Sequence, residues 1–186
     1  ERKKAEETIR RSESALKKAQ RVARVGNWTW HIVTNRLEAS DEMYRIFGIE
    51  KEAFSGDLND LIERVIHPDD RAAVEHSNAS VAKNKPIIPL EYRIVLSDGT
   101  ERWIWAEAGE VIRDKADNPI MLTGIVQDIT ERKQAEEDLR KLNRTLTLLS
   151  NVNQTIVRVR DTSNLFDEAC RIAIDDGGFR MAWIGM

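Results

Sequence analysis

Few side chains in this sequence are of the types that carry out chemistry, and their spacing forms no catalytic set. His76 lies on a predicted helix with Val74 and Val81 nearby, and a haem iron would need such an axial ligand to face an apolar pocket. A lone histidine on a surface helix is usually exposed, and His67, which directly precedes a proline, is typical of a helix start. The sequence shows no phosphate-binding loop, zinc-ligand spacing or nucleophile–base pair. We therefore expect no catalysis and no metal site within this chain.

The composition is that of a soluble globular protein with an unusually high share of charged residues. Charged residues make up 33% and hydrophobic residues 41%, and 29 Lys and Arg nearly cancel 32 Asp and Glu. This balance argues against nucleic acid or an acidic membrane surface as a partner. Cys170 is the one cysteine, so no intramolecular disulfide can form, which fits a cytoplasmic location. No apolar run approaches the roughly 20 residues of a membrane span. Both ends are typical of cuts through a longer protein.

A short repeat frames the chain. Residues 1–7 are ERKKAEE and residues 131–137 are ERKQAEE, which differ at a single position. Each copy begins a stretch whose apolar residues recur at alternating spacings of three and four, the pattern of an amphipathic helix with a heptad seam. We therefore expect one signalling helix over residues 1–24 and a second, linking helix over residues 131–158.

The second heptad seam is the stronger of the two and favours a dimeric coiled coil. In the first seam Ser12 and three alanines accompany Ile9 and Leu16, whereas four leucines follow one another in the second. The polar Asn153 can set register or partner number at some cost in stability. The second seam consists of Leu139, Leu142, Leu146, Leu149, Asn153 and Ile156. We expect a homodimer through the flanking helices; the alternative is that each helix lies against its own domain.

Between these helices, from residue 25 to residue 130, the helical pattern gives way to short strands and helices. Trp28, Trp30 and Ile32 alternate with polar residues, as in a half-buried strand. Ser40 suits a helix N-cap and Gly48 a helix end. The further predicted elements are a strand at 36–39, helices at 41–47, 58–66 and from 68 to about 84, and strands at 90–96, 102–112 and 120–128. This order predicts an α+β domain with an antiparallel sheet and helices gathered on one face.

An ordered set of motifs in this region resembles the PAS domain, in the subtype with a Trp-rich first strand and a C-terminal PAC motif. The motifs are GNWTWHI at 26–32, SDEMYRIFGI at 40–49, HPDDR at 67–71, EYRIVLSDGTERWIWAEA at 91–108 and GIVQDITERKQAEE at 124–137. The resemblance implies a five-stranded sheet in the order 2-1-5-4-3. It also implies helices over one face and, where a ligand binds, a pocket between helices and sheet.

Asp128, Ile129 and Thr130 join the last predicted strand to the second helix. Two capping arrangements are open: a capping box from Asp128 to Glu131, or a Thr130 hydroxyl that accepts from an amide of the first turn. In either arrangement the strand passes into the helix without a flexible linker, so a shift of the strand would move the helix. The resemblance implies that this Asp-Ile-Thr joint passes the sensed signal to the effector. The alternative is a plain helix cap without a signalling role.

Seven residues are candidates for a ligand pocket, and plain core packing is the alternative for each of them. They are Trp28, Trp30, Phe47, Val74, His76, Leu122 and Val126. We expect no cofactor; the resemblance leaves open a haem held by His76 or a noncovalent flavin stacked on the tryptophans. The flavin-linked cysteine of light-sensing PAS relatives is absent, because Cys170 lies outside the domain. A small-molecule ligand also stays open.

The tail from residue 159 to residue 186 resembles the opening of a GAF domain that is cut short. Asp161-Thr162 is a helix-start signal and Gly177-Gly178 a helix stop, and residues 179–186 predict a first strand. Too little of the GAF sheet is present for it to close. We therefore expect hydrophobic side chains of the tail, among them Ile174, to be exposed or to pack on a partner chain.

The sequence as a whole predicts a non-catalytic sensory and dimerising module of a bacterial signalling protein. The output enzyme would lie outside this chain, as a two-component histidine kinase or a GGDEF/EAL-type cyclic-dinucleotide enzyme such as a diguanylate cyclase. The alternative is a structural protein–protein interaction module with a filled, ligand-free core. An enzyme would need a catalytic constellation that the sequence lacks.

Overall fold

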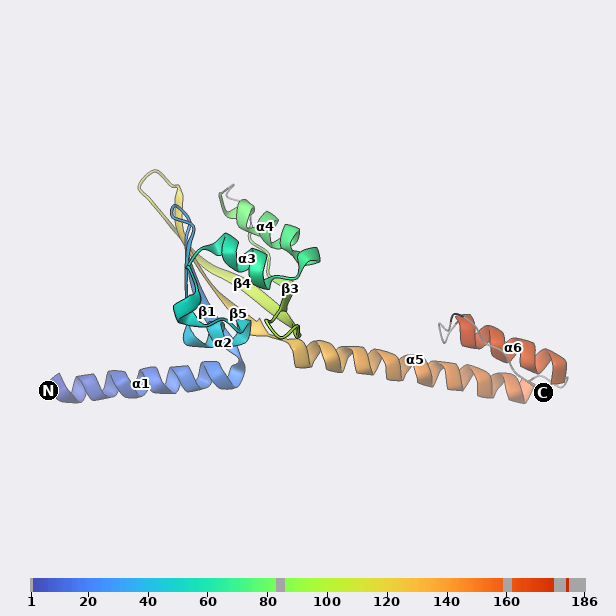
Figure 1. Cartoon of the computed structure of the whole chain (residues 1–186). Coiled ribbons are helices and arrows are strands. Elements are labelled where there is room, and N and C mark those ends of the chain that lie inside the picture. Colours follow the sequence, from blue (N-terminus) through green and yellow to red (C-terminus); the bar gives the residue numbers. More distant parts are fainter. Residues whose placement is uncertain (1, 83–85, 159–161, 176–179, 181–186) are drawn as a thin grey trace. The chain divides into compact units, whose positions relative to one another are not determined.

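The computed structural model describes residues 2–82, 86–158, 162–175 and 180. The chain divides into two compact units, Glu1–Thr130 and Glu131–Met186, and each is described by itself. The elements of the first unit, shown in Figure 1, are α1 (Arg2–Ala23), β1 (Val25–His31), β2 (Arg36–Ala39), α2 (Asp41–Phe47), the 3-10 helix η1 (Lys51–Ala53), α3 (Leu58–Val65), α4 (Pro68–Ala82), β3 (Leu90–Val95), β4 (Glu101–Arg113) and β5 (Pro119–Asp128).

The five strands form one antiparallel sheet in the order β2-β1-β5-β4-β3. This arrangement confirms the predicted α+β fold and the strand order that the PAS resemblance implied. Asn35 at φ 53° and Gly99 at φ 82° provide the left-handed backbone of the β1–β2 and β3–β4 turns. The first and last strands, β1 and β5, are neighbours, so the two ends of the domain lie side by side in the sheet.

The hydrophobic core lies between one face of the sheet and helices α2, α3 and α4 (Figure 1). On β3 and β4 the buried Tyr92, Ile94 and Ile104 alternate with more exposed neighbours, as the period of a half-buried strand requires. The helices contribute the buried side chains Met43, Ile46, Phe47, Leu61, Ile62, Val65, Val74 and Val81. The core therefore lies on one face of the sheet, beneath the three helices.

Helix α2 begins and ends at the predicted residues and packs closely on β1. The Ser40 hydroxyl caps it by accepting from the Met43 N–H at 3.3 Å, and it also accepts from the Asn27 N–H at 3.0 Å. Gly48 ends the helix in the left-handed conformation, with φ at 64°. A Cβ at Gly26 would lie 2.7 Å from the Met43 Cα, so glycine permits this close approach.

Helix α4 is tied at its N-terminus to strand β3. The His67 N–H donates to the Arg93 carbonyl at 3.0 Å. The Asp70 carboxylate accepts from the Arg93 backbone N–H, Nε and Nη2 at 2.8, 2.9 and 2.8 Å. The helix ends at Ala82, and the last residues of the helix predicted to about residue 84 lie outside the described residues.

The second unit contains α5 (Thr130–Arg158) except for its first residue, and α6 (Thr162–Asp175). Four leucines of the second heptad seam, Leu139, Leu142, Leu146 and Leu149, are 53–59% exposed, and Asn153 is exposed as well. The side chain of Ile156, the predicted helix stop at 177–178 and the predicted strand at 179–186 lie outside the described residues. In α6, Ile172 is buried and Ile174 is 43% exposed. Across the described ranges, no helix is long and apolar enough to cross a membrane.

Candidate functional site

A cavity of about 90 Å³ lies between the sheet and helices α3 and α4. Five of the seven predicted pocket candidates line it: Trp28 and Trp30 from β1, Leu122 and Val126 from β5, and Val74 from α4. On β4 the lining residues are Ala106 and Ala108, whose small side chains leave space for the cavity above the sheet. The structure thus brings together side chains from distant parts of the chain around one apolar space.

Phe47 and His76 do not line this cavity. Phe47, the last residue of α2, is buried in the core and does not reach the cavity wall. His76 is exposed on α4, so the structure corrects its placement among the pocket candidates. The periodicity of α4 explains this. The residues of α4 that line the cavity are spaced by three and four positions and so share one helix face, and His76 does not lie on that face. They are Val74, Ser77, Asn78 and Val81.

Three polar residues on the cavity wall were not among the sequence candidates. They are Tyr92 on β3 and Ser77 and Asn78 on α4. Tyr92 is only 7% exposed, and its burial raises the pKa of the phenol, which therefore stays protonated as a hydrogen-bond donor. The alternation along β3 places Tyr92 on the same face as the buried Ile94, and this periodicity was the available signal.

The Asp-Ile-Thr joint is held by hydrogen bonds to strand β4. The Ile129 N–H donates to the Trp103 carbonyl at 2.9 Å, and the Trp103 N–H donates to the Thr130 hydroxyl oxygen at 3.0 Å. The Thr130 hydroxyl and N–H both donate to Asp128 Oδ1, at 2.6 and 3.0 Å. One residue of β4 thus bonds to both residues that follow β5. These contacts connect Asp128 and Thr130, the two capping candidates, to one another.

The residues that leave α1 are bonded to the end of the same strand. The Asp128 N–H donates to the Arg24 carbonyl at 3.2 Å, and Gln127 Nε2 donates to the Ala23 carbonyl at 3.3 Å. Arg24 has a φ of 53°, a left-handed conformation that turns the chain from α1 into β1. The polypeptide therefore arrives at the domain and leaves it at one end of the β1–β5 pair.

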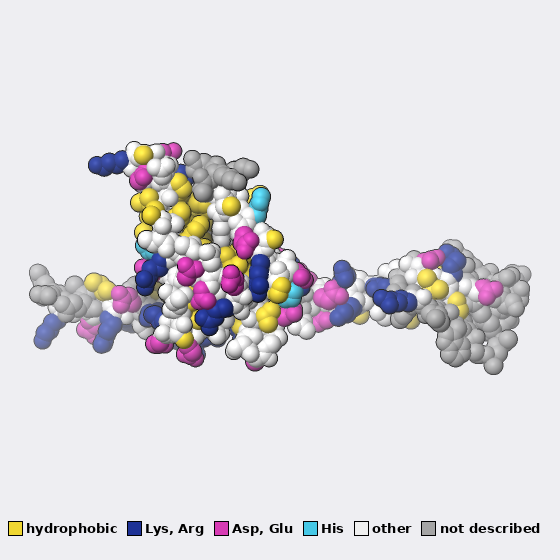
Figure 2. Space-filling view, turned by 45° about the horizontal axis from the view of Figure 1, so that its top comes forward, with side chains coloured by type: hydrophobic (Ala, Val, Ile, Leu, Met, Phe, Trp, Pro, Cys, Tyr) yellow, Lys and Arg dark blue, Asp and Glu magenta, His cyan; other side chains and the backbone are white. Residues whose placement is uncertain are grey.

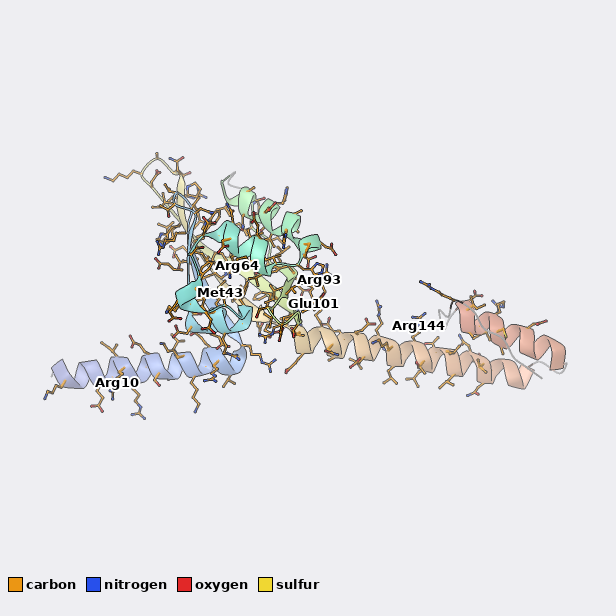
Figure 3. The ribbon with its side chains drawn as sticks, viewed as in Figure 1. Arg10, Met43, Arg64, Arg93, Glu101 and Arg144 are labelled. Carbon is orange, nitrogen blue, oxygen red and sulfur yellow. The ribbon has the colours of Figure 1, made fainter. Side chains whose placement is uncertain are left out.

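Arg93 links the N-terminus of α4 to Trp103. Its guanidinium lies 5.8 Å from the centre of the Trp103 ring, in the arrangement of a cation–π contact. The same guanidinium lowers the pKa of the Asp70 carboxyl by hydrogen bonding to it. Figure 3 places Arg93 and Glu101 at the end of the domain near the start of α5. Helix α4, which forms a wall of the cavity, is thus joined by contacts to the residue that holds the joint.

No metal-binding cluster accompanies these features. Among the described residues, no group of three or more His, Cys, Asp or Glu side chains is placed to hold a metal ion. Among the described residues, Tyr92 is the one titratable group on the cavity wall.

Comparison with known proteins shows the family of this domain. Residues 36–126 match a family described as PAS fold. A "Blue-light-activated histidine kinase" of Brucella anthropi is 32% identical over 173 residues, which cover 87% of this chain and 34% of that protein. A protein of the same description from Brucella ovis is 30% identical with the same coverage. The chain therefore spans about a third of the length of the curated relatives it matches.

Two solved structures share the fold. A sensory box histidine kinase/response regulator from Burkholderia thailandensis matches with 27% identity and a TM-score of 0.57, covering 70% of this chain and 96% of that one. The N-terminal domain of a diguanylate cyclase with PAS/PAC sensor from Marinobacter aquaeolei matches with 21% identity and a TM-score of 0.52 over 59% and 98% of the chains. With the strand order and the covering helices, these matches identify the domain between α1 and α5 as a PAS domain.

Proposed function

We propose that this chain is a non-catalytic sensory module in which the state of the PAS core is passed to α5 through the Asp-Ile-Thr joint. The observation that carries the proposal is the pair of hydrogen bonds from the Trp103 backbone to Ile129 and Thr130. Because one β4 residue holds both positions, a displacement of β4 against β5 acts on the first residue of the helix. Elements with two discrete arrangements are the physical basis of such switching.

The contacts from the cavity to the joint run through four residues. Asp70 lies in the first turn of α4, whose next turns line the cavity, and it is bonded to Arg93. Arg93 lies over the Trp103 ring, and the Trp103 backbone bonds to Thr130. A ligand that displaces α4 would therefore pull on the joint through charged and aromatic contacts. Spatial continuity alone does not establish coupling, so the proposal depends on variants along this path.

The heptad seam supports a homodimer as the form in which α5 acts. Leucines at alternating spacings of three and four, each more than half exposed, form an apolar stripe that a second copy of the helix would cover. In a dimer, rotation or sliding of paired helices carries a change from a sensor to an output domain. The relatives named as histidine kinases support a kinase as that output, outside this chain, and a diguanylate cyclase is the alternative.

The residues of the cavity do not fit a flavin or a haem. A cavity of about 150 Å³ holds a single benzene ring, whereas the cavity here measures about 90 Å³. A three-ring flavin or a haem is far larger. Cys170 lies in α6, and His76 lies on the exposed side of α4. We infer that this domain does not sense light or gases through either group.

Four finer assignments are part of the same proposal. The PAC label for residues 124–137 is supported by the motif and by the joint, and a GAF opening at residues 159–186 by the sequence and the α6 helix. The domain limits at 24, 130 and 158 are supported by the ends of α1, β5 and α5. A cytoplasmic location is supported by the single cysteine.

A chimera tests this function directly. Residues 1–149 are fused, in heptad register, to the dimerisation helix of a histidine kinase with measurable autophosphorylation. Thr130→Val removes the hydroxyl that joins Trp103 to Asp128, and the control Thr123→Val removes a hydroxyl of strand β5 that bonds to Glu110. We expect the first change to shift the phosphorylation rate by at least about fivefold, the lower range of allosteric coupling, and the second to leave it unchanged. Equal rates in all three proteins would refute the proposal.

A further inference from the structure

Helix α1 is bonded to the domain at the residues that lead into the Asp-Ile-Thr joint. The Arg24 carbonyl accepts from the Asp128 N–H at 3.2 Å, and the Ala23 carbonyl accepts from Gln127 Nε2 at 3.3 Å. The Asp128 carboxylate accepts in turn from both the hydroxyl and the N–H of Thr130, the first residue of α5. Along these bonds, Asp128 alone lies between the end of α1 and the start of α5.

The turn between α1 and β1 holds the helix in one geometry. Arg24 has a left-handed conformation with φ at 53°, and its N–H donates to the Arg21 carbonyl at 3.3 Å. A residue other than glycine keeps such a conformation only where the surrounding contacts hold it. The next residue, Val25, begins β1 and pairs with Gln127. Because Arg24 alone separates α1 from β1, a displacement of the helix acts directly on the strand.

Charged and polar side chains also attach α1 to α2 and β1. Lys17 Nζ donates to Asp41 Oδ2 at 3.1 Å, and Gln20 Nε2 donates to Asn27 Oδ1 at 3.3 Å. Lys51 Nζ donates to the other carboxylate oxygen of Asp41 at 3.2 Å. The hydrogen bonds from Lys17 and then Lys51 lower the pKa of the Asp41 carboxyl, so it stays ionised as their partner. Figure 1 shows α2 over the last turns of α1, and Figure 2 shows basic and acidic side chains interspersed over α1 and the adjoining part of the domain.

Helix α2 is bonded in turn to β4 beside Trp103. Arg102 Nη1 donates to the Ile46 carbonyl of α2 at 2.8 Å. Arg102 directly precedes Trp103, whose backbone bonds to Ile129 and Thr130. A movement of α1 therefore reaches the joint through β5 directly and through β4 by way of α2. None of the residues on these two routes lines the cavity.

We propose that α1 is a second input element of this domain, and that its displacement acts on the Asp-Ile-Thr joint without a change in the cavity. The PAS core and α1 then converge on Asp128 and Thr130, and α5 responds to both. The step from the joint to α5 rests on the proposed function, whereas the step from α1 to the joint does not. Continuity of contacts does not by itself establish coupling, so one end must be perturbed and the other measured.

Charge reversal at two adjacent lysines tests the step from α1 to the joint on the full chain. Lys17→Glu places a carboxylate against Asp41 and should release α1 from α2. Lys18→Glu makes the same change at an exposed residue outside the surface that α1 turns to α2. We expect Lys17→Glu to raise the exchange rate of the Asp128 amide, measured by nuclear magnetic resonance, by about two- to fivefold, as the loss of one surface ion pair provides. Lys18→Glu should leave this rate unchanged, and the Ile62 amide in α3 should exchange equally in all three proteins.

Two further backgrounds show which part of the molecule carries the effect. Two glycines inserted after Lys18 interrupt the helix between Lys17 and Ala23 and leave the contacts at the joint in place. In this background Lys17→Glu should no longer change the exchange rate of the Asp128 amide. Ala106→Leu places a larger side chain into the cavity, and the response to Lys17→Glu should persist in its presence.

Four results would overturn the inference. They are an unchanged Asp128 amide in Lys17→Glu, an equal change in Lys18→Glu, a response that survives the glycine insertion, or a response that Ala106→Leu abolishes. Failure here and failure of the sensory function are distinguishable. If Lys17→Glu leaves the Asp128 amide unchanged while the kinase chimera responds to Thr130→Val, α1 is no input and the signalling joint stands. If Lys17→Glu changes the amide while the chimera is insensitive to Thr130→Val, the route from α1 stands and the signalling function fails.

Discussion

Thr130→Val is expected to loosen the contact between strand β4 and the start of α5. The Thr130 hydroxyl accepts from the Trp103 N–H at 3.0 Å and donates to Asp128 Oδ1 at 2.6 Å. Valine keeps the branched shape and removes both bonds. It leaves the Trp103 amide, in the interior of a strand pairing, without this acceptor.

The magnitude follows from these two bonds. A neutral hydrogen bond contributes about 1 kcal/mol net, and one to a charged group contributes about 1.5–3 kcal/mol. Thr130 and Asp128 are both half-buried, so water replaces part of what is lost. We therefore expect the free energy of unfolding to fall by about 2 kcal/mol. The effects of Thr130→Val and Asp128→Ala should not add, because both remove the same bond.

Urea unfolding at pH 7 measures this loss, and amide hydrogen exchange localises it. The Trp103 amide should exchange faster in Thr130→Val than in the parent protein, while the Ile104 amide in the core changes less. Thr123→Val serves as the control, because its hydroxyl contacts the exposed Glu110 at 3.2 and 3.4 Å. A Thr130→Val protein within about 0.5 kcal/mol of the parent, the range of ordinary surface changes, would refute the structural account of the joint.

Three further predictions concern α4, the sheet and the dimer. Asp70→Asn should destabilise the domain at pH 7. The pKa of Asp70 in the folded protein lies below 3.8, so the contribution of its carboxylate to the free energy of unfolding is complete above about pH 4 and is lost as the pH falls through that folded pKa. Urea melts of parent and variant should therefore converge in acid, and a gap that persists there would contradict the cause assigned. Gly124→Ala should cost about 1–3 kcal/mol, because the new Cβ would lie 2.2 Å from Trp28 Cζ2; an unchanged melting temperature would contradict this. Leu146→Asp should convert a dimer into a monomer in sedimentation equilibrium, whereas Arg144→Glu, off the heptad seam, should not; a dimer that survives Leu146→Asp would exclude this seam.

Local signals in the sequence predicted most elements of the domain. Ser40 and Gly48 bound α2 as expected, because capping depends on residues within one turn. The alternation of β3 and the turn at Gly99 gave the hairpin with β4. Strand order is set by pairings between distant residues, and here it came from the family resemblance and not from a local pattern.

The missed features of the site are those that depend on distant partners. The Trp103 backbone meets Thr130 across 27 positions of sequence, and nothing near Trp103 indicates this contact. Ser77 and Asn78 share the helix face of Val74, as their three-and-four spacing in the sequence indicates. The same spacing places His76 off the helix face that lines the cavity, and its side chain is exposed.

The central claim, that a change in the PAS core is passed to α5 through the joint, is tested most directly by hydrogen–deuterium exchange of residues 131–142. Ala106→Leu places a larger side chain from β4 into the cavity and thereby changes the packing of the PAS core without an added ligand. We predict that it alters exchange of these α5 amides in the parent protein and has no such effect when Thr130→Val is also present. Identical α5 exchange with and without Ala106→Leu, or the same change in both backgrounds, would contradict the account.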